Sequence, residues 1–307
     1  MKPPPAGSRL RFVLTLFLSA LFLIPSGSLF AQRRTSESEG LSVFVDAGML
    51  IPSAKQANFY CGRPENPNTI ERVLYSNSYG QQIWTSLRDQ GLLQGVGSYS
   101  EIQLADYPDM YYKLAYQIGV GIRYGYAHGW GWLLRFDFSQ LTAAGVFHLY
   151  NGPQAGILTN QDRYVTCGMF GSERRIYIDI ALTKRFSLGK RFELEADLGY
   201  NLNNTKVMKH QMEIGGEYYS ILDVWNGQNP YAGIGSYEYI NQGGLGMGAF
   251  ATLSLCYAIP GYGSLEFGYT CYHTQTVFTD YNKSDAFAFQ HLIFVRANLN
   301  NFSFWND

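Results

Sequence analysis

Hydrophobic and polar residues alternate with a period of two in several segments of the chain. From Leu114 to Tyr126 one face is aliphatic and aromatic, while the other carries Lys113, Arg123 and several glycines. The same alternation recurs in 132–138, 176–188 and 192–202, and more weakly in 41–51, 245–257, 264–276 and 286–299. Such alternation is typical of strands whose two faces meet different surroundings. The pattern predicts eight strands, each of about 10 residues or more, which is long enough to cross an outer membrane.

The connections between these segments alternate strictly in length. Short, glycine-containing turns are expected near 128–130, 189–191 and 260–263, and long loops near 52–110, 150–173, 203–243 and 277–285. Outer-membrane barrels have short periplasmic turns and long extracellular loops. We therefore predict an all-β fold, an antiparallel up-and-down transmembrane β-barrel of eight strands. The segment 207–225 indicates a further hairpin, which leaves ten strands open, but its polar faces favour a hairpin standing above the membrane.

The N-terminal residues have the pattern of an export signal. Lys2, Arg9 and Arg11 precede an apolar stretch over 12–24, and Ala31 offers a small residue at a cleavage site. A basic region, a short apolar region and a small residue are typical of a secretory signal peptide. We predict a cleaved signal over 1–31, a short periplasmic segment over 32–40 and a single barrel domain over 41–307, located in the outer membrane.

Composition narrows the function classes. The 307 residues carry a net charge of −1, 15% are charged and 16% are aromatic. This chain is too apolar to be disordered and lacks the basic excess of a nucleic-acid binder, so no nucleic-acid partner is expected. A soluble periplasmic β-barrel that binds an apolar ligand would show the same alternation with its apolar face inward. Glycines on the polar face, such as Gly119, Gly121 and Gly268, favour a crowded lumen instead.

If the apolar face meets lipid, the polar face lines the lumen. The predicted lumen charge network comprises Asp46, Lys113, Arg123, Arg135, Asp137, Asp179, Arg185, Glu193, Glu195, Asp197, Glu266 and Arg296. Side chains can just fill an eight-stranded interior, and an unpaired buried charge costs several kcal/mol. Arg185 and Glu195 lie nearly symmetrically about the turn at 189–191, so we expect them to pair across two strands. The network favours a closed plug over an ion path that uses the excess acids.

On these patterns, the chain over 41–299 resembles the small eight-stranded outer-membrane barrels of the OmpA, OmpX and OmpW type. The resemblance implies contact with outer-membrane lipid and lipopolysaccharide and with the barrel assembly machinery. An OmpW-type likeness implies a channel for hydrophobic solutes. Some small barrels are lipid-modifying enzymes with a histidine and a hydroxyl near the outer rim. Here Thr274 points away from His273, so we predict no catalytic residue.

No phosphate-binding loop or histidine spacing typical of a metal site is present in the sequence. We therefore predict no cofactor-binding and no metal-binding residue.

The long loops hold the remaining candidates. Cys61 and Cys167 lie in the first two loops, and a disulfide between them is one hypothesis. Short amphipathic helical turns are expected at 69–74 and 82–88. Arg174 and Arg175 lie at the outer rim, where they would meet lipopolysaccharide phosphates or stay solvated. The candidate loop binding surface comprises Trp84, Tyr218, Tyr219, Trp225, Tyr231, Tyr237 and Tyr239.

Such loops either bind an extracellular protein or glycan, or pack on themselves as a cap. We therefore expect a non-enzymatic outer-membrane barrel that serves as a structural scaffold and surface-loop binding protein. The hydrophobic-solute channel, the lipid-modifying enzyme and the soluble periplasmic barrel remain the alternatives.

Overall fold

The structure, a computed structural model, describes residues 40–76, 79–93, 96–150, 164–221, 242–259, 263–281 and 286–299. These residues all belong to one compact unit that begins at residue 38. The predicted signal peptide, the segment 32–39 and the last residues from 300 lie outside the described ranges. No helix in these ranges is long and apolar enough to cross a membrane.

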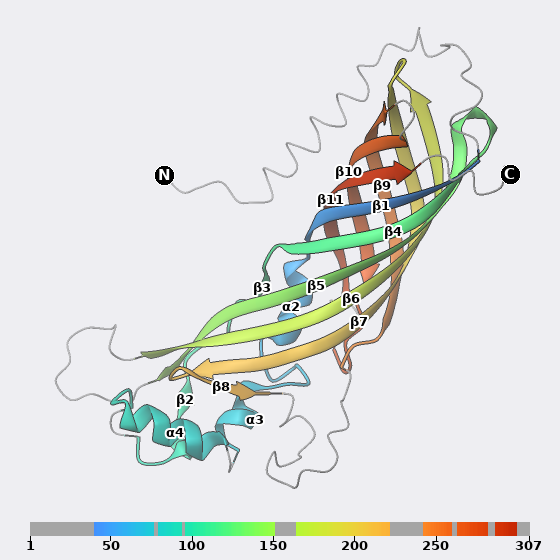
Figure 1. The fold of residues 1–307 in the computed structure, drawn as a ribbon. Helices are drawn as coiled ribbons and strands as arrows, with labels where there is room; N and C mark the ends of the chain where they lie inside the picture. The colour runs from blue at the N-terminus through green and yellow to red at the C-terminus, as the bar shows by residue number, and fades with distance from the viewer. Residues whose placement is uncertain are drawn as a thin grey trace, which may run out of the picture. The chain divides into compact units, whose positions relative to one another are not determined.

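Eight long strands form a closed antiparallel ring (Figure 1). They are β1 (Gly40–Ile51), β4 (Ala115–Gly125), β5 (Trp130–Tyr150), β6 (Tyr164–Ser187), β7 (Phe192–Ile214), β9 (Leu245–Ile259), β10 (Gly263–Gln275) and β11 (Phe287–Leu299). Each pairs with its neighbours in the order β5-β4-β1-β11-β10-β9-β7-β6, and pairing of β5 with β6 closes the ring. The predicted eight-stranded barrel is confirmed.

The strand register fixes the width of this barrel. A path across directly paired residues leaves β1 at Ile51, crosses all the other barrel strands and returns to β1 at Leu41. The path is thus staggered by ten residues over eight strands. Stagger and strand number together set the tilt and the diameter of a barrel, and eight strands leave room for side chains alone.

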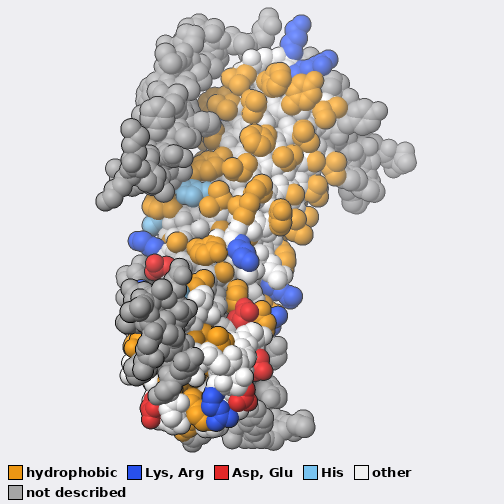
Figure 2. Space-filling view, turned by 90° about the vertical axis from the view of Figure 1, so that its left-hand side faces the viewer, with side chains coloured by type: hydrophobic (Ala, Val, Ile, Leu, Met, Phe, Trp, Pro, Cys, Tyr) orange, Lys and Arg blue, Asp and Glu red, His pale blue; other side chains and the backbone are white. Residues whose placement is uncertain are grey.

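The outer surface of the barrel is an apolar band. Its members alternate along every strand and include Val45, Ile118, Phe136, Ile180, Leu198, Leu255, Phe267 and Val295, each exposed by 44% or more. Figure 2 shows hydrophobic side chains spread over one face of this surface. The inward residues at the same level are buried and include most of the ion-paired charges of the lumen, together with a small apolar cluster that contains Phe44 and Phe294. This is the reverse of a soluble β-barrel and the architecture of an outer-membrane barrel.

Three strands continue beyond the apolar band. β5, β6 and β7 have 21, 24 and 23 residues, whereas the other barrel strands have 11 to 15. β6 begins at Tyr164 and β7 ends at Ile214, so the expected loops at 150–173 and 203–243 wrongly include residues that belong to these two strands. The alternation inverts above the band: inward residues become apolar, as at Phe147 and Met169, and outward residues become polar, as at Arg174.

The first long connection is a folded cap rather than an open loop. It contains α2 (Ala54–Ala57), η1 (Asn58–Tyr60), α3 (Ile70–Leu74), α4 (Tyr79–Asp89), η2 (Tyr99–Glu101), β2 (Gln103–Leu104) and β3 (Tyr111–Tyr112). Side-chain oxygens of Ser53 and Thr69 cap the first turns of α2 and α3, as expected for these residue types. The two predicted helical turns correspond to α3 and α4.

This folded connection packs against the inward, apolar side of the extended β5, β6 and β7. It also packs against β8 (Glu217–Ser220), which pairs with β7. The shared core includes Phe59, Ile83, Phe147, Met169 and Met212. β8 and the end of β7 form the expected hairpin above the membrane, so it adds no strand to the barrel. We use the name cap for residues 54–112, β8 and the extensions of β5, β6 and β7.

The short turns lie at the opposite end of the barrel. η3 (Ala127–Gly129) joins β4 to β5, with His128 and Gly129 at φ values of 66° and 74°. A side chain at Gly129 would be strained at this φ and would also press on the Arg185 carbonyl oxygen. Gly189, in the turn between β6 and β7, does not have a positive φ. The turn residues 260–262 lie outside the described ranges.

Candidate functional site in the lumen and cap

The lumen near the short turns holds a cluster of arginines and glutamates. Arg185 and Glu195 face each other across β6 and β7, with Nε 2.7 Å from Oε2, which is the predicted cross-strand pair. Arg123 also pairs with Glu195 and lies 3.3 Å from Glu266. Its Nη1 donates to Asn298 Oδ1 at 3.0 Å. The glutamate carboxylates thus bridge arginines from several strands.

The centre of the lumen repeats this arrangement with aspartates. Arg296 lies opposite both Glu266 and Asp46 in the register, at 2.9 Å and 3.2 Å. Arg135 lies opposite Asp179, with which it pairs, and its Nε is 2.9 Å from an oxygen of Asp137. Such pairing compensates the cost of burying charge in a space this narrow.

A second ion-paired cluster joins the lumen to the cap. Arg175 Nε donates to Glu173 Oε1 at 2.6 Å, and Tyr60 of the cap donates to Glu173 Oε2 at 2.7 Å. Arg175 also donates to Gln56 of α2 and Gln290 of β11, at 3.0 Å and 2.8 Å. All of these groups are buried. The cluster therefore fastens the cap to two sides of the barrel mouth.

The predicted strand begins at 176, whereas β6 begins at Tyr164, so Glu173 and Arg175 of this junction lie outside the predicted strand. The inward face of β6 continues through Glu173, Arg175, Tyr177 and Asp179 without a break. The signal was the unbroken period of two. Arg175, expected at the outer rim, is fully buried, whereas Arg174 is exposed. The proposed contact of Arg175 with lipopolysaccharide was wrong because the residue lies on the inward face.

The remaining members of the predicted network have different positions. Lys113 is exposed before the start of β4 and does not lie in the lumen, so its assignment was wrong. Glu193 is half-buried near the short turns, 3.9 Å from Arg185. Asp197 is buried in the lumen and, among the described residues, has no ion-pair partner within 4.0 Å.

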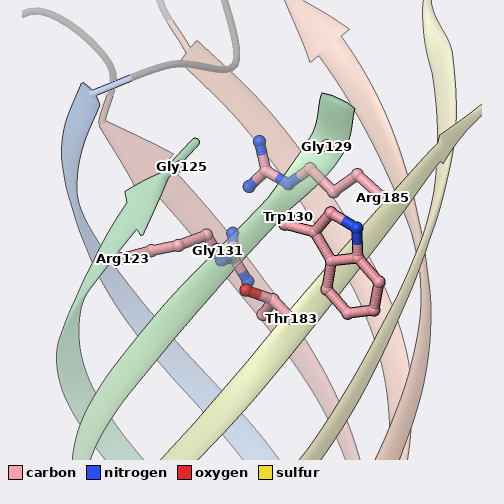
Figure 3. Close-up of a pocket in the computed structure, with 7 residues that line it drawn as sticks. All are labelled: Arg123, Gly125, Gly129, Trp130, Gly131, Thr183 and Arg185. Atoms are coloured by element: carbon pink, nitrogen blue, oxygen red, sulfur yellow. The ribbon is translucent and has the colours of Figure 1, made fainter. Parts of the chain in front are cut away.

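The lumen is packed rather than open. Asp46, Arg123, Arg135, Asp179, Glu195, Glu266 and Arg296 are each exposed by 8% or less. A water-filled path would expose the side chains that line it. A pocket at the short-turn end is lined by Arg123, Trp130, Thr183 and Arg185 (Figure 3). Its volume is about 10 Å³, which suits roughly one water molecule.

One group in the lumen has the ligand types of a metal site. A donor atom from each of Glu195, Cys256 and Glu266 lies within 4.8 Å of the others. Both carboxylates already pair with arginines. A metal cation would meet these guanidinium groups at close range, so we assign no metal to this group.

The cysteines do not form the expected loop disulfide. Cys61 and Cys167 are free and buried in the cap. Each thiol has its own polar neighbour, since Asn66 Nδ2 donates to the Cys61 sulfur at 3.1 Å and the Cys167 thiol donates to the Val165 carbonyl at 3.6 Å. Burial raises the pKa of both thiols, that of Cys167 to about 12. The expected bridge is absent because the two sulfurs lie free, each against a different polar neighbour.

The aromatic residues of the candidate loop surface divide between core and surface. Tyr219 is 3% exposed and packs in the cap core, so it offers no contact area. Trp84 is half-buried, donates to the Val96 carbonyl at 3.1 Å and stacks under Arg88. Tyr218 is 60% exposed. Trp225, Tyr231, Tyr237 and Tyr239 lie outside the described residues.

The histidines of the outward face lack a catalytic arrangement in the described structure. His273 lies against Phe287 and Phe289, and the neighbouring Thr274 accepts a hydrogen bond from Gln290 inside the barrel. His291 bonds and stacks with Tyr269 on the same outward face. A lipid-modifying centre needs a nucleophile beside its base, and neither histidine has an aliphatic hydroxyl among its described partners.

His210 is the buried histidine of the cap. Asn68 Nδ2 donates to its Nδ1 at 3.0 Å, and its Nε2 donates to the Tyr60 carbonyl at 3.2 Å. Asn68 and Gln242 form two further hydrogen bonds of 2.8 Å and 2.9 Å. Burial lowers the pKa of His210 to about 3. This neutral imidazole thus joins β7 to Tyr60 and Asn68, and Asn68 in turn bonds with Gln242 before β9.

No family model matches the chain, and no curated protein matches it. Among solved structures the chain is similar to Neisserial surface protein A (NspA), with 8% identity and a TM-score of 0.38 over 86% of this chain and 98% of that one. It is also similar to the outer membrane protein OprG from Pseudomonas aeruginosa, with 9% identity, a TM-score of 0.38 and the same coverage of both chains. For Ail, the attachment invasion locus protein of Yersinia pestis, the values are 9% and 0.30, over 85% and 99%.

Proposed function

We propose that this chain is a non-enzymatic outer-membrane barrel with a closed lumen, which serves as a scaffold that presents a folded, ligand-binding cap outside the cell. The observation that carries the proposal is the junction of Glu173, Arg175 and Tyr60, which fixes the cap to the barrel mouth. A rigid barrel with structured outer segments is a common arrangement for recognition.

The closed lumen supports the scaffold over the hydrophobic-solute channel. A channel of this kind needs an apolar or hydrated path, whereas the described lumen is crossed by buried ion pairs between Asp46, Arg135 and Asp179. Removing charges from such a network is costly because partners are left unpaired. Solute passage would therefore require a large rearrangement of the interior.

Conductance and surface exposure test this function together. Purified, heat-modifiable protein is inserted into planar bilayers, and intact cells are treated with a protease. We expect no steady conductance above the bare bilayer, and cleavage confined to segments outside the barrel. Steady single-channel currents would overturn the scaffold in favour of the channel. Extraction of the protein from membranes by carbonate would overturn the outer-membrane location.

Binding by the cap is tested separately. Cells that display the chain are compared with cells that lack it for retention of extracellular matrix proteins and glycans. Exposed aromatic residues supply contact area at low entropic cost, so we expect Tyr218→Ala to weaken retention and Tyr111→Ala, at the other edge of the extension, to serve as the matched exposed control. Equal retention by both kinds of cell would leave a scaffold without a binding role.

A further inference from the structure

The outer face of β5, β6 and β7 changes character at one cross-strand row. Gln140, Arg174 and Lys206 lie directly opposite one another in the register. The row below contains Phe138 and Ile176, which belong to the apolar band. The row above contains Thr142, Ser172 and Lys209. We call Arg174, Lys206 and Lys209, which are all exposed, the basic collar.

The basic collar concentrates like charge. Arg174 and Lys206 are direct cross-strand neighbours, and like charges in such positions destabilise a sheet. Glu173, next to Arg174, points inward and is held by Arg175. Glu213, four residues after Lys209, lies beside Tyr218. Neither Arg174 nor Lys209 has an ion-pair partner within 4.0 Å among the described residues. An anion that contacts the collar would form charge-assisted hydrogen bonds with these cations.

The surfaces on either side of the collar indicate which class of anion would bind there. Below it lies the apolar band, with Ile176, Ile178 and Leu202 on the same two strands. Above it Phe170 and Tyr218 form an aromatic pair with ring centroids 6.2 Å apart, and Tyr218 is largely exposed.

This order of apolar, cationic and aromatic surface matches an amphiphile with acyl chains, phosphates and sugar rings. We propose that the outer face of β6 and β7 binds a phosphorylated glycolipid of the outer leaflet, with its phosphates on Arg174, Lys206 and Lys209 and its acyl chains along the band. The outward residues at the upper ends of β9 and β11 are, by contrast, Leu245 and Phe287. The inference rests on the proposed outer-membrane location.

The experiment measures retention of defined lipids by the full chain in nanodiscs, using native mass spectrometry. The probes are bisphosphorylated lipid A and the same acylated disaccharide without phosphates. The test variant is Arg174→Gln with Lys206→Gln. The matched control, Arg63→Gln with Arg72→Gln, removes two exposed cap charges far along the chain from the collar.

We expect the wild-type protein to prefer the phosphorylated probe by about tenfold, a ratio that corresponds to one charge-assisted contact. The control should keep this preference, the test variant should lose it, and added salt should weaken it. The proposal is overturned if the wild-type protein shows no preference, or if the control loses as much as the test variant. Equal binding of a phosphorylated disaccharide without acyl chains would overturn the lipid assignment.

Membrane fractionation of cells keeps the two proposals separate. Both variants and the wild-type protein are checked for heat-modifiable migration and for an outer-membrane position. A correctly located protein without phosphate preference refutes the glycolipid site alone. A chain absent from the outer membrane refutes the proposed location, whatever it binds in nanodiscs.

Discussion

Four lumen residues show how the register creates the network. Arg135 lies opposite Asp179, and Arg185 lies opposite Glu195, so each pair forms as soon as its two strands align. A slip of one residue would turn every one of these charges toward lipid. The ion pairs therefore specify the register more than they add to stability, since well-packed apolar residues could replace them at little cost.

Removing one partner of a buried ion pair, by contrast, destabilises the barrel. Arg135→Met leaves Asp46, Asp137 and Asp179 without their shared cation. We expect the free energy of unfolding to fall by about 3–5 kcal/mol, as for other broken buried pairs. Urea unfolding of the detergent-refolded barrel measures the change. Arg191→Met, at an exposed turn residue, is the matched control, and an equal loss in both variants would contradict the buried network.

Glycines allow the lumen to be this crowded. A Cβ atom built on Gly248 would lie 2.5 Å from the backbone Cα of Thr274 on the paired strand. Because backbone cannot move aside, we expect Gly248→Ala to destabilise the barrel by about 1–3 kcal/mol. Gly189→Ala is the control, since no atom lies within 4 Å of its Cβ position. Unchanged heat-modification temperatures in both variants would count against a tightly packed interior.

At the residue scale, the sequence predicted which residues pair more accurately than it predicted where each strand begins and ends. The alternation placed Arg185 and Glu195 on one face and symmetrically about a turn, which is enough to pair them. The same alternation misassigned Lys113, because the residue lies just before β4, where the period no longer fixes which way a side chain points. The sequence predicts Tyr219 at the surface, whereas it is buried, because a loop that folds into a core has no local signature of its own.

At the scale of elements, the inversion of polarity explains what the sequence left hidden. β5 has polar inward residues at Asp137 and Ser139, but apolar ones from Leu141 onward. The alternation with a period of two continues, but the apolar residues move from the outward face to the inward face. A strand predicted from one apolar face therefore ends at the inversion. The inversion itself marks the level at which lipid gives way to the cap, and it recurs on β6 and β7.

At the scale of elements, the buried His210 predicts how the stability of the cap changes at acidic pH. The pKa of His210 is about 3 in the folded cap and 6.5 in an unfolded chain. As pH falls below 6.5 the unfolded cap takes up a proton that the folded cap refuses, so stability is lost between these two values. At pH 5 the loss is about 2 kcal/mol, while above pH 6.5 the full stability is present.

Hydrogen exchange of cap peptides, corrected for intrinsic rates, measures this loss between pH 7 and pH 5. The variant His210→Gln is the control. Its amide oxygen can accept from Asn68 and its amide nitrogen can donate to the Tyr60 carbonyl, yet it does not titrate. We expect exchange to accelerate in the wild-type cap and to change little in the variant. The same acceleration in both would assign the acid response to other groups.

At the scale of the whole molecule, the described residues form two separate hydrophobic cores, one in the cap and one in the barrel. The cap core includes Phe59 and Met212, the barrel core includes Phe44 and Leu292, and no fully buried residue belongs to both. The closed hydrogen-bonded ring holds the barrel together, whereas the cap depends on side-chain packing and the Glu173–Arg175 junction. Regions that differ in this way commonly open at different free energies.

The native cysteines can report this order of unfolding. Cys61 and Cys167 lie in the cap core and Cys256 in the lumen, and all three are at most 4% exposed. A thiol reagent is applied across a urea series to one variant that keeps the cap thiols (Cys256→Ala with Cys271→Ala) and to another that keeps only the lumen thiol of Cys256 (Cys61→Ala, Cys167→Ala and Cys271→Ala), because Cys271 is partly exposed in the folded barrel. We expect the cap thiols to react at clearly lower urea, because the cap opens while the strand ring is intact. Coincident midpoints would mean that cap and barrel unfold as one unit.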